Sequence, residues 1–207
     1  YRACLDRLIK ADLVYPAFLS RGETKALVRA FEAESNLWPR DPDGAPLYPG
    51  IDSQRPRAER EALLASGRPH AWRLDMEKAI RTTASPLFWQ ESGDGETGLI
   101  EARPALWGDV VLSRSDAPSS YHLSVVVDDA LQGITHVVRG MDLFHATAIH
   151  RLLQQLLDLP QPAYHHHRLI LGTDGRKLSK SEGSTGLSAL RAQGATPSDI
   201  RRIVGLV

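Results

Sequence analysis

Segments that read as strands alternate with segments that read as helices over residues 109–171, and this alternation constrains the fold most. Strand-like apolar runs lie at 109–114, 135–138 and 168–171. Between them the residue pattern predicts helices over 121–131 and 142–157, the second with an apolar face of helical spacing. Strand–helix alternation is typical of a parallel sheet covered by helices. We therefore expect an α/β fold.

The remaining segments are shorter and more mixed. The sequence predicts an N-terminal helix, a strand-like run at Leu13–Tyr15 that stops at Pro16, and a helix introduced by a capping box at Ser20–Glu23. Further expected elements are an ordered loop at 39–49, a helix between Pro56 and Gly67, short antiparallel strands over 71–107, and a helical segment at 187–207. The last helix is expected to start at Thr196.

Composition excludes several classes of protein. The 207 residues are 42% hydrophobic and 24% charged, as in ordinary soluble domains. No apolar run reaches the roughly 20 residues that span a bilayer, so we expect no membrane association. The N-terminal residues lack a signal-peptide pattern, which favours a cytoplasmic location. A single cysteine, Cys4, excludes an internal disulfide and a multi-cysteine metal site.

A lysine- and serine-rich loop follows the last of the strand-like runs. Its central residues are Lys177, Leu178, Ser179, Lys180 and Ser181. Two ammonium groups beside small residues after a tight turn are suited to holding phosphate. The alternative is a solvated basic turn. Eight Lys or Arg against four Asp or Glu in residues 145–207 are compatible with either interpretation.

Two polar side chains stand where ligands of α/β sheets bind. Arg139 lies at the end of a predicted strand, and an arginine there can clamp a carboxylate with two parallel hydrogen bonds. Tyr121 can offer a hydroxyl to an amino or carboxylate group. The alternatives are that Arg139 only pairs with Asp142, and that Asp128 and Asp129 only solvate a helix.

These motifs resemble the glutamyl branch of class I aminoacyl-tRNA synthetases. The matching residues are Tyr-His-Leu-Ser-Val-Val-Val-Asp-Asp at 121–129, Gly-Ile-Thr-His-Val-Val-Arg-Gly at 133–140, and Lys-Leu-Ser-Lys-Ser at 177–181. The resemblance implies that Tyr121 and Arg139 bind glutamate and that Lys180 is catalytic through ATP. It also implies that residues 177–181 form a loop that closes over ATP.

Within that branch the chain resembles the glutamyl-queuosine tRNA(Asp) synthetases. The segments that carry this resemblance are Leu-Tyr-Pro-Gly-Ile-Asp at 47–52 and Ala-Trp-Arg-Leu-Asp-Met at 71–76. The resemblance implies activation of glutamate with ATP and Mg²⁺ without tRNA, then transfer to the queuosine base of tRNA(Asp), by a monomer. It also implies a Rossmann-like parallel sheet. The implied segments are the end of a first Rossmann half (1–15), an α+β insertion resembling an acceptor-binding domain (16–108), the second half (109–176), and the Lys/Ser loop with a C-terminal helical segment (177–207).

The chain departs from this family at its zinc site. Many members hold zinc with three cysteines and a tyrosine, and the cysteine positions correspond to Ala17, Leu19 and Ile51 or Asp52. Only Tyr48 remains of that set. Because thiolates hold zinc in such sites, we expect no zinc, and packing by Phe18, Leu19 and Tyr48 in its place.

A second departure is the lack of a His-Ile-Gly-His motif. The resemblance therefore leads us to expect a C-terminal portion of the enzyme, nearly inactive by itself. A fragment of an ordinary glutamyl-tRNA synthetase and a non-catalytic binding paralogue are the alternatives. The run His165–His167 is expected to be a strand edge near the nucleotide pocket, because adjacent strand residues point apart and share one metal ion poorly. The histidines at 122, 136, 145 and 150 are expected to be structural or exposed.

Overall fold

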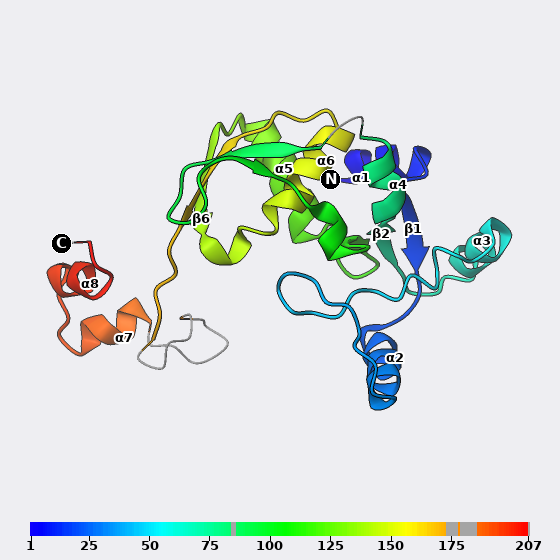
Figure 1. Ribbon diagram of the computed structural model, residues 1–207, viewed down its shortest axis with the longest axis horizontal. Helices are drawn as coiled ribbons and strands as arrows, with labels where there is room; N and C mark the ends of the chain where they lie inside the picture. Colours follow the sequence, from blue (N-terminus) through cyan, green and yellow to red (C-terminus); the bar gives the residue numbers. More distant parts are fainter. Residues whose placement is uncertain (84–85, 173–177, 179–185, 207) are drawn as a thin grey trace.

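The computed structural model describes residues 1–83, 86–172, 178 and 186–206. The chain forms two sheets with helices packed against them (Figure 1). The helices are α1 (Arg2–Lys10), α2 (Arg21–Ala33), α3 (Arg57–Ala65), α4 (Met76–Arg81), α5 (Tyr121–Gln132), α6 (Thr147–Leu156), α7 (Leu187–Ala192) and α8 (Pro197–Ile203), with 3₁₀ turns η1 (Pro104–Trp107) and η2 (Met141–Leu143). The strands are β1 (Val14–Ala17), β2 (Ala71–Leu74), β3 (Phe88–Glu91), β4 (Gly98–Glu101), β5 (Val111–Arg114), β6 (His136–Gly140) and β7 (Ala163–His167).

The first sheet is antiparallel and has the strand order β1-β2-β5. Pro16, at which the apolar stretch 13–15 stops, lies inside β1, which continues to Ala17. Proline lacks a backbone N–H, but β1 pairs with only one neighbour in this sheet, so Pro16 can turn its nitrogen away from the ladder. Asp109 ties the sheet to its surroundings by accepting hydrogen bonds from the Tyr15 hydroxyl at 2.6 Å and from the backbone N–H of Met76 at 2.9 Å.

The second sheet has the order β4-β3-β7-β6, and β3, β7 and β6 run parallel. Helix α6 connects β6 to β7, as in a βαβ unit, and the expected α/β fold is confirmed. In the predicted region of short antiparallel strands, β3 and β4 do form an antiparallel pair. That region also contains helix α4, which the sequence analysis did not predict.

The strand predicted at 168–171 is wrong, because the strand of the sheet is β7 at Ala163–His167. Tyr164 and His166 point inward and are almost fully buried, whereas Ile170 and Leu171 are substantially exposed. The polar atoms of the two buried side chains have partners, among them Gln154 for Tyr164 and Glu91 for His166. Such satisfied polar groups can occupy a core position that a hydrophobic pattern assigns to aliphatic residues.

Two further expectations are corrected. The helix predicted over 142–157 begins at Thr147, because residues 141–143 form the 3₁₀ turn η2 and Phe144 packs edge-on against the rings of Trp89 and His166. The histidine run is not on a strand edge, since β7 lies between β3 and β6.

Local sequence signals placed the helix starts well. The Ser20 hydroxyl accepts from the backbone N–H of Glu23 at 3.2 Å, and the Glu23 carboxylate accepts from the Ser20 N–H at 2.7 Å. Thr196 and Asp199 make the same reciprocal cap at the start of α8. Gly67 follows α3 with a positive φ of 73°, which glycine adopts without strain.

The main core lies where α1, α5 and α6 meet the first sheet. Its fully buried members include Leu74, Leu112, Leu123, Ile149 and Leu152. A smaller cluster of Trp89, Ala102, Ala148 and Tyr164 lies against the second sheet. Helix α6 contributes to both clusters, so it holds the two sheets in one body.

Helices α2 and α3 extend away from this body, and α7 and α8 lie at its opposite end (Figure 1). A hydrogen bond from the Arg168 guanidinium to the carbonyl of Val204, at 2.7 Å, links α8 to the segment after β7. The boundaries expected at residues 15, 108 and 176 stay predictions. Strands on both sides of residue 108 share a sheet, as β2 and β5 do. In the described part of the chain, no helix has the length and apolarity to cross a membrane.

Helix α5 offers a matched test of the core. Leu123 is fully buried and Leu131 is 77% exposed on the same helix. We expect Leu123→Ala to lower the free energy of unfolding by about 2–5 kcal/mol, because it removes apolar contacts and leaves a cavity. Leu131→Ala is expected to change it by less than about 0.5 kcal/mol. Urea unfolding of both variants measures the difference, and equal effects would contradict this placement of α5.

Candidate functional site

The carboxyl ends of β6 and β7 bring Arg139 and His166 side by side. The two residues are direct partners in the parallel ladder, so their side chains leave the same face of the sheet. That face is covered by the start of α6, where Thr147 is completely buried. Arg139 is thus held at the strand ends, where ligands of open α/β sheets bind.

Four groups accept hydrogen bonds from the Arg139 guanidinium. Nε donates to Nε2 of His166 at 2.9 Å, and Nη1 donates to Nδ1 of His150 at 3.1 Å. Nη2 donates to the Thr147 hydroxyl at 2.7 Å and to the Leu143 carbonyl at 3.2 Å. Two imidazoles, a hydroxyl and a carbonyl carry no negative charge. The positive charge of Arg139 is therefore not cancelled by these partners.

Tyr121 and Arg139, the two residues expected to bind glutamate, both contact His150. The ring of Tyr121 is 5.7 Å from the ring of His150, centroid to centroid. Tyr121 is the first residue of α5 and is half exposed, so its hydroxyl is available to a ligand. The structure thus brings together two residues that are separated by a helix and a strand in the sequence.

His150 and His122 extend the hydrogen-bond chain toward the surface. Because Arg139 donates to Nδ1 of His150, the proton of His150 is on Nε2, which donates to Nδ1 of His122 at 3.2 Å. Burial, and secondarily the nearby charge of Arg139, lowers the pKa of His122 to about 4. The same two causes, in the same order, hold the pKa of His150 well below its usual value. Both rings are therefore neutral near pH 7. The expectation that these histidines are structural or exposed did not anticipate the hydrogen bond from Arg139 to His150.

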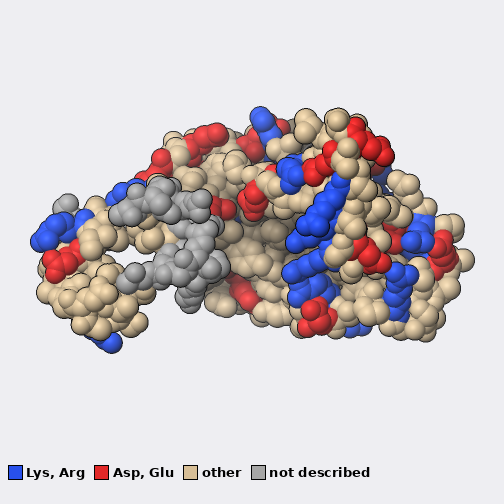
Figure 2. Space-filling model, turned by 90° about the horizontal axis from the view of Figure 1, so that it is seen from below, with Lys and Arg blue, Asp and Glu red and all other residues tan. Residues whose placement is uncertain are grey.

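A large cleft opens beside Tyr121 and His122, with a volume of about 1400 Å³. It runs from the start of α5, past β5 and β2, to the start of α2. Its basic side chains are Arg21, Lys25, Arg68, Arg73 and Arg114, and its acidic ones are Glu23, Asp41, Asp109 and Asp116. Figure 2 shows a band of basic side chains beside a hollow in the surface.

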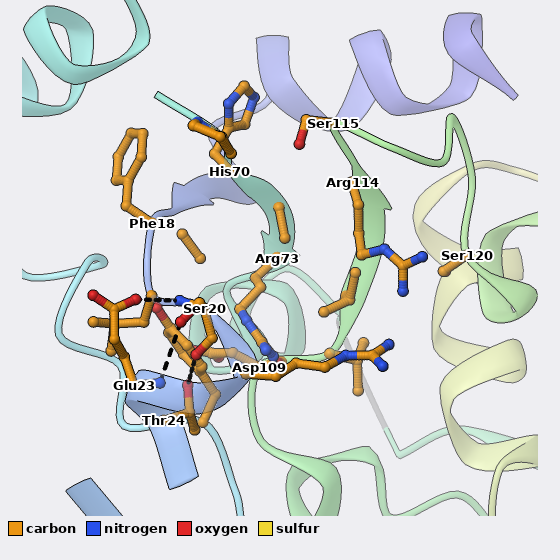
Figure 3. Close-up of a pocket in the computed structure, with 18 of the residues that line it drawn as sticks. Phe18, Ser20, Glu23, Thr24, His70, Arg73, Asp109, Arg114, Ser115 and Ser120 are labelled. Carbon is orange, nitrogen blue, oxygen red and sulfur yellow. Dashed lines mark hydrogen bonds between the residues drawn. The ribbon is translucent and has the colours of Figure 1, made fainter. Parts of the chain in front are cut away.

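Arg73 and Arg114 extend into this cleft from the neighbouring strands β2 and β5 (Figure 3). The Arg73 guanidinium lies 3.8 Å above the ring centre of Tyr48. Its buried Nε has no hydrogen-bond partner among the described residues. Arg114 pairs with Asp116 at 2.8 Å, and that pair is exposed and readily exchanged for another anion. The cleft therefore has cationic groups with capacity for a polyanion.

The Lys/Ser loop falls almost entirely outside the described residues. Lys177, Ser179, Lys180 and Ser181 are among those not described, so their assigned roles stay predictions. Leu178 is described, is half exposed, and donates its backbone N–H to the carbonyl of Ile170 at 3.2 Å. That contact places Leu178 beside the segment that follows β7.

The residues at the family's zinc positions do not fit a zinc ion. Ala17 and Leu19 have no donor atom, and the carboxylate of Asp52 is already surrounded. It accepts hydrogen bonds from the Phe18 N–H at 2.9 Å, from Arg55 Nε at 2.7 Å and from the Tyr48 hydroxyl. Asp52 is completely buried. A carboxylate thus joins loops 17–19 and 48–55. Sequence reasoning expected packing by Phe18, Leu19 and Tyr48 and missed this role of Asp52.

Replacing Asp52 tests whether it is the crosslink of these loops. Burial by itself would raise the Asp52 pKa, but hydrogen bonds from Tyr48, Arg55 and Phe18 outweigh it and hold that pKa below the ordinary value. We expect Asp52→Asn to destabilise the fold by about 3 kcal/mol near neutral pH, since it leaves buried donors poorly paired.

Because the folded-state pKa of Asp52 is lowered, its contribution is complete above the unfolded value near 3.9 and is lost as pH falls through the folded value. Asp6→Asn, in an exposed pair with Arg2, is the control and should have little effect. Elemental analysis of the purified protein tests the prediction of no zinc. Stoichiometric zinc, or equal stability of the two variants, would contradict this assignment.

His122 gives a pH-dependent prediction. Its folded-state pKa of about 4 lies below the unfolded value near 6.5, so the unfolded chain binds more protons between these limits. Stability contributed by neutral His122 is therefore lost as pH falls from 6.5 toward 4. We expect this loss to be roughly 1–3 kcal/mol and to be absent in His122→Gln, which cannot titrate. Parallel curves of unfolding free energy against pH for the two proteins would contradict the prediction.

Comparison with known proteins identifies the family of this chain. Residues 49–207 match the model of the catalytic domain of tRNA synthetases class I (E and Q). The chain is 45% identical over its whole length to a glutamyl-Q tRNA(Asp) synthetase from Rhodobacter capsulatus, of which it spans 72%. It is 36% identical to one from Nocardia farcinica over 97% of the chain and spans 57% of that protein.

Solved structures show the same fold. The structure of a glutamate-tRNA synthetase from Elizabethkingia anophelis superposes with a TM-score of 0.66 and 25% identity over 88% of this chain and 36% of that one. A glutamate tRNA ligase from Elizabethkingia meningosepticum, solved in complex with its amino acid, gives 0.65 and 26% over the same shares. On the family match and on these relatives, the chain belongs to the glutamyl-Q tRNA(Asp) synthetases, a family with the class I synthetase catalytic domain.

Proposed function

We propose that this chain contributes the glutamate site and part of the nucleic-acid surface of an enzyme that activates glutamate and attaches it to the queuosine base of tRNA(Asp). One observation carries the proposal: among the described residues the Arg139 guanidinium, at the carboxyl ends of β6 and β7, has only neutral acceptors, and one of them, His150, also packs against the ring of the half-exposed Tyr121. A substrate with a carboxylate and an amino group suits this pair of side chains. The names of the relatives supply the identity of glutamate and of the tRNA.

Activation joins the glutamate α-carboxylate to the α-phosphorus of ATP, and pyrophosphate leaves. The barrier comes mainly from bringing two anions together and from the charge that develops on the leaving group. Positioning and electrostatic stabilisation are what a protein can supply against it. In the proposed reaction Arg139 and Tyr121 hold glutamate in place. Lys180 and Lys177 neutralise phosphate charge when their loop closes over ATP, which enters with its own Mg²⁺.

The cleft beside Tyr121 is the proposed surface for the tRNA. Arg73 and Arg114 extend into it (Figure 3), and Arg21, Lys25 and Arg68 also line it. Cations spaced along a groove follow a phosphate backbone without reading its bases. Since the cleft begins at Tyr121 and His122, a nucleoside held there could approach the activated glutamate. Recognition of queuosine, activation without tRNA, a monomeric state and a cytoplasmic location are parts of the same proposal.

The first test is glutamate-dependent exchange between ATP and pyrophosphate, on the longest polypeptide that the gene encodes. Exchange without tRNA is the expected result. Exchange only after addition of tRNA would favour an ordinary glutamyl-tRNA synthetase. No exchange under either condition would contradict an enzymatic role and favour a binding paralogue.

Two substitutions separate the proposed roles. Arg139→Lys keeps the charge but loses the planar fork, so we expect the KM for glutamate to rise roughly 30-fold or more. Lys180→Ala should lower kcat for exchange far more than it changes glutamate binding. Arg103→Lys, at an exposed position, is the control for the first variant. An unchanged glutamate KM in Arg139→Lys, or unchanged exchange in Lys180→Ala, would remove that residue from the mechanism.

A further inference from the structure

Glu91 is a buried carboxylate near Arg139 that the proposed reaction does not use. It ends β3, the neighbour of β7, and is 1% exposed. Its Oε1 accepts hydrogen bonds from the backbone N–H groups of Ser92 at 3.2 Å, Gly93 at 2.9 Å and His166 at 2.9 Å. Its Oε2 accepts from Trp89 Nε1 at 3.2 Å and from His166 Nδ1 at 2.6 Å. A carboxylate with five donors around it is fully satisfied.

This surrounding keeps Glu91 ionised. Burial alone would raise its pKa, but the hydrogen bonds from the backbone and ring of His166, with those from Trp89 and Gly93, outweigh burial and lower it. An ionised carboxylate can only accept, so the ring proton of His166 must be on Nδ1. Burial lowers the pKa of His166 against the opposing effect of Glu91, and the ring is neutral. Its Nε2 therefore presents a lone pair.

That lone pair faces Arg139, whose Nε donates to it at 2.9 Å. We propose that Glu91 is a positioning residue for Arg139, because it sets the tautomer of His166 and thereby the orientation of the guanidinium that receives the substrate's carboxylate. The proposal rests on the proposed function, in which Arg139 binds glutamate.

The neutral ring between the two charges has a physical purpose. A glutamate bonded directly to Arg139 would compete with the substrate's carboxylate for the same donors. With an imidazole between them, Glu91 orients Arg139 while the guanidinium keeps its positive charge for the ligand, together with the one N–H of Nη1 that has no acceptor among the described residues. His150 and Thr147, which accept from Nη1 and Nη2, hold the other side of the same plane.

The backbone around Glu91 is built for this contact. A Cβ at Gly93 would lie 2.2 Å from the carbonyl oxygen of His166 and 2.5 Å from its nitrogen. Only glycine lets the turn after β3 approach β7 so closely. That approach also allows the Asp94 N–H to reach the His166 carbonyl at 2.9 Å. Backbone contacts between the turn after β3 and strand β7 thus hold the Glu91 carboxylate against the His166 ring.

Glu91→Gln is the sharpest test, because it keeps the size of the side chain but puts a donor in the place of the acceptor Oε2. The hydrogen bonds from Glu91 through His166 to Arg139 then cannot keep their direction. The amide oxygen can keep the three backbone donors, so the amide N–H₂ replaces Oε2 and faces His166 Nδ1. His166 must then carry its proton on Nε2, where it opposes the N–H of Arg139. Glu101→Gln, on the exposed neighbouring strand β4, is the matched control for loss of one carboxylate.

Two readouts follow from this argument. Nitrogen NMR of histidine in the purified chain is expected to show His166 with its proton on Nδ1 in the wild type and on Nε2 in Glu91→Gln. In the exchange assay of the longest polypeptide, Glu91→Gln should raise the glutamate KM about tenfold or more, with kcat and the KM for ATP changed less than about threefold. Glu101→Gln should match the wild type in both readouts.

A second pair of variants decides the question if Glu91→Gln does not fold. His166→Gln keeps a donor toward Glu91 and an acceptor toward Arg139, whereas His166→Leu keeps neither. The glutamate KM should therefore rise much less in the first than in the second. Equal effects in this pair, or an unchanged tautomer and glutamate KM in Glu91→Gln, would overturn the proposal. If the wild type does not use glutamate, the proposed function fails instead, and the NMR result still decides whether Glu91 sets the His166 tautomer.

Discussion

The parallel pairing of β6 with β7 is the constraint on which the site depends. It places Arg139 directly opposite His166 and turns both side chains to the face that α6 covers. The buried start of α6 then supplies Thr147 and His150 as further acceptors for the guanidinium. A register shift of one residue would send Arg139 to the other face of the sheet, because side chains alternate along a strand. Strand register therefore decides which side chains surround Arg139.

Two buried carboxylates serve different purposes in the chain. Asp52 contacts Arg55 directly, and its charge holds two loops together at the positions where the family resemblance led us to look for zinc ligands. Glu91 is separated from Arg139 by a neutral histidine. The first arrangement produces a closed crosslink, whereas the second leaves a cation that can still attract an anion. The difference lies in whether a polar group stands between the two charges.

The cleft lies beside Tyr121 and His122 and has room for a larger ligand. It is formed by the antiparallel sheet and the start of α2, which come before the parallel strands in the chain. Its basic side chains are partly matched by acidic ones, as Arg114 is by Asp116. Because such exposed pairs contribute little to stability, a phosphate can replace the carboxylate at small cost. The cleft meets the proposed glutamate site at Tyr121 and His122, in the first turn of α5.

Local signals in the sequence were sufficient where the interacting groups are near one another along the chain. The capping boxes at Ser20 and Thr196, the helix after Pro56 and the helix from Tyr121 were all predictable, since three or four neighbouring residues determine them. The strand after α6 was not, because Tyr164 and His166 are buried polar residues that only distant partners can satisfy. The true start of α6 was missed for a similar reason, as Trp89 reaches Phe144 from elsewhere in the fold. Helix α4 did carry a local signal, since the Asp75 side chain caps it by accepting from the Lys78 N–H, but its six residues are too few to show a helical pattern.

The motifs also allowed Tyr121 and Arg139 to be named as a pair before their positions were known. Glu91, His150 and Asp52 gave no comparable signal, since each is an ordinary polar residue whose partners are distant in the sequence or belong to another loop. What the sequence alone determined is the α/β class, several helix starts and the family. What only the tertiary structure decided is which side chains surround Arg139, because a hydrogen bond to a buried charge depends on strand register and helix packing rather than on spacing along the chain.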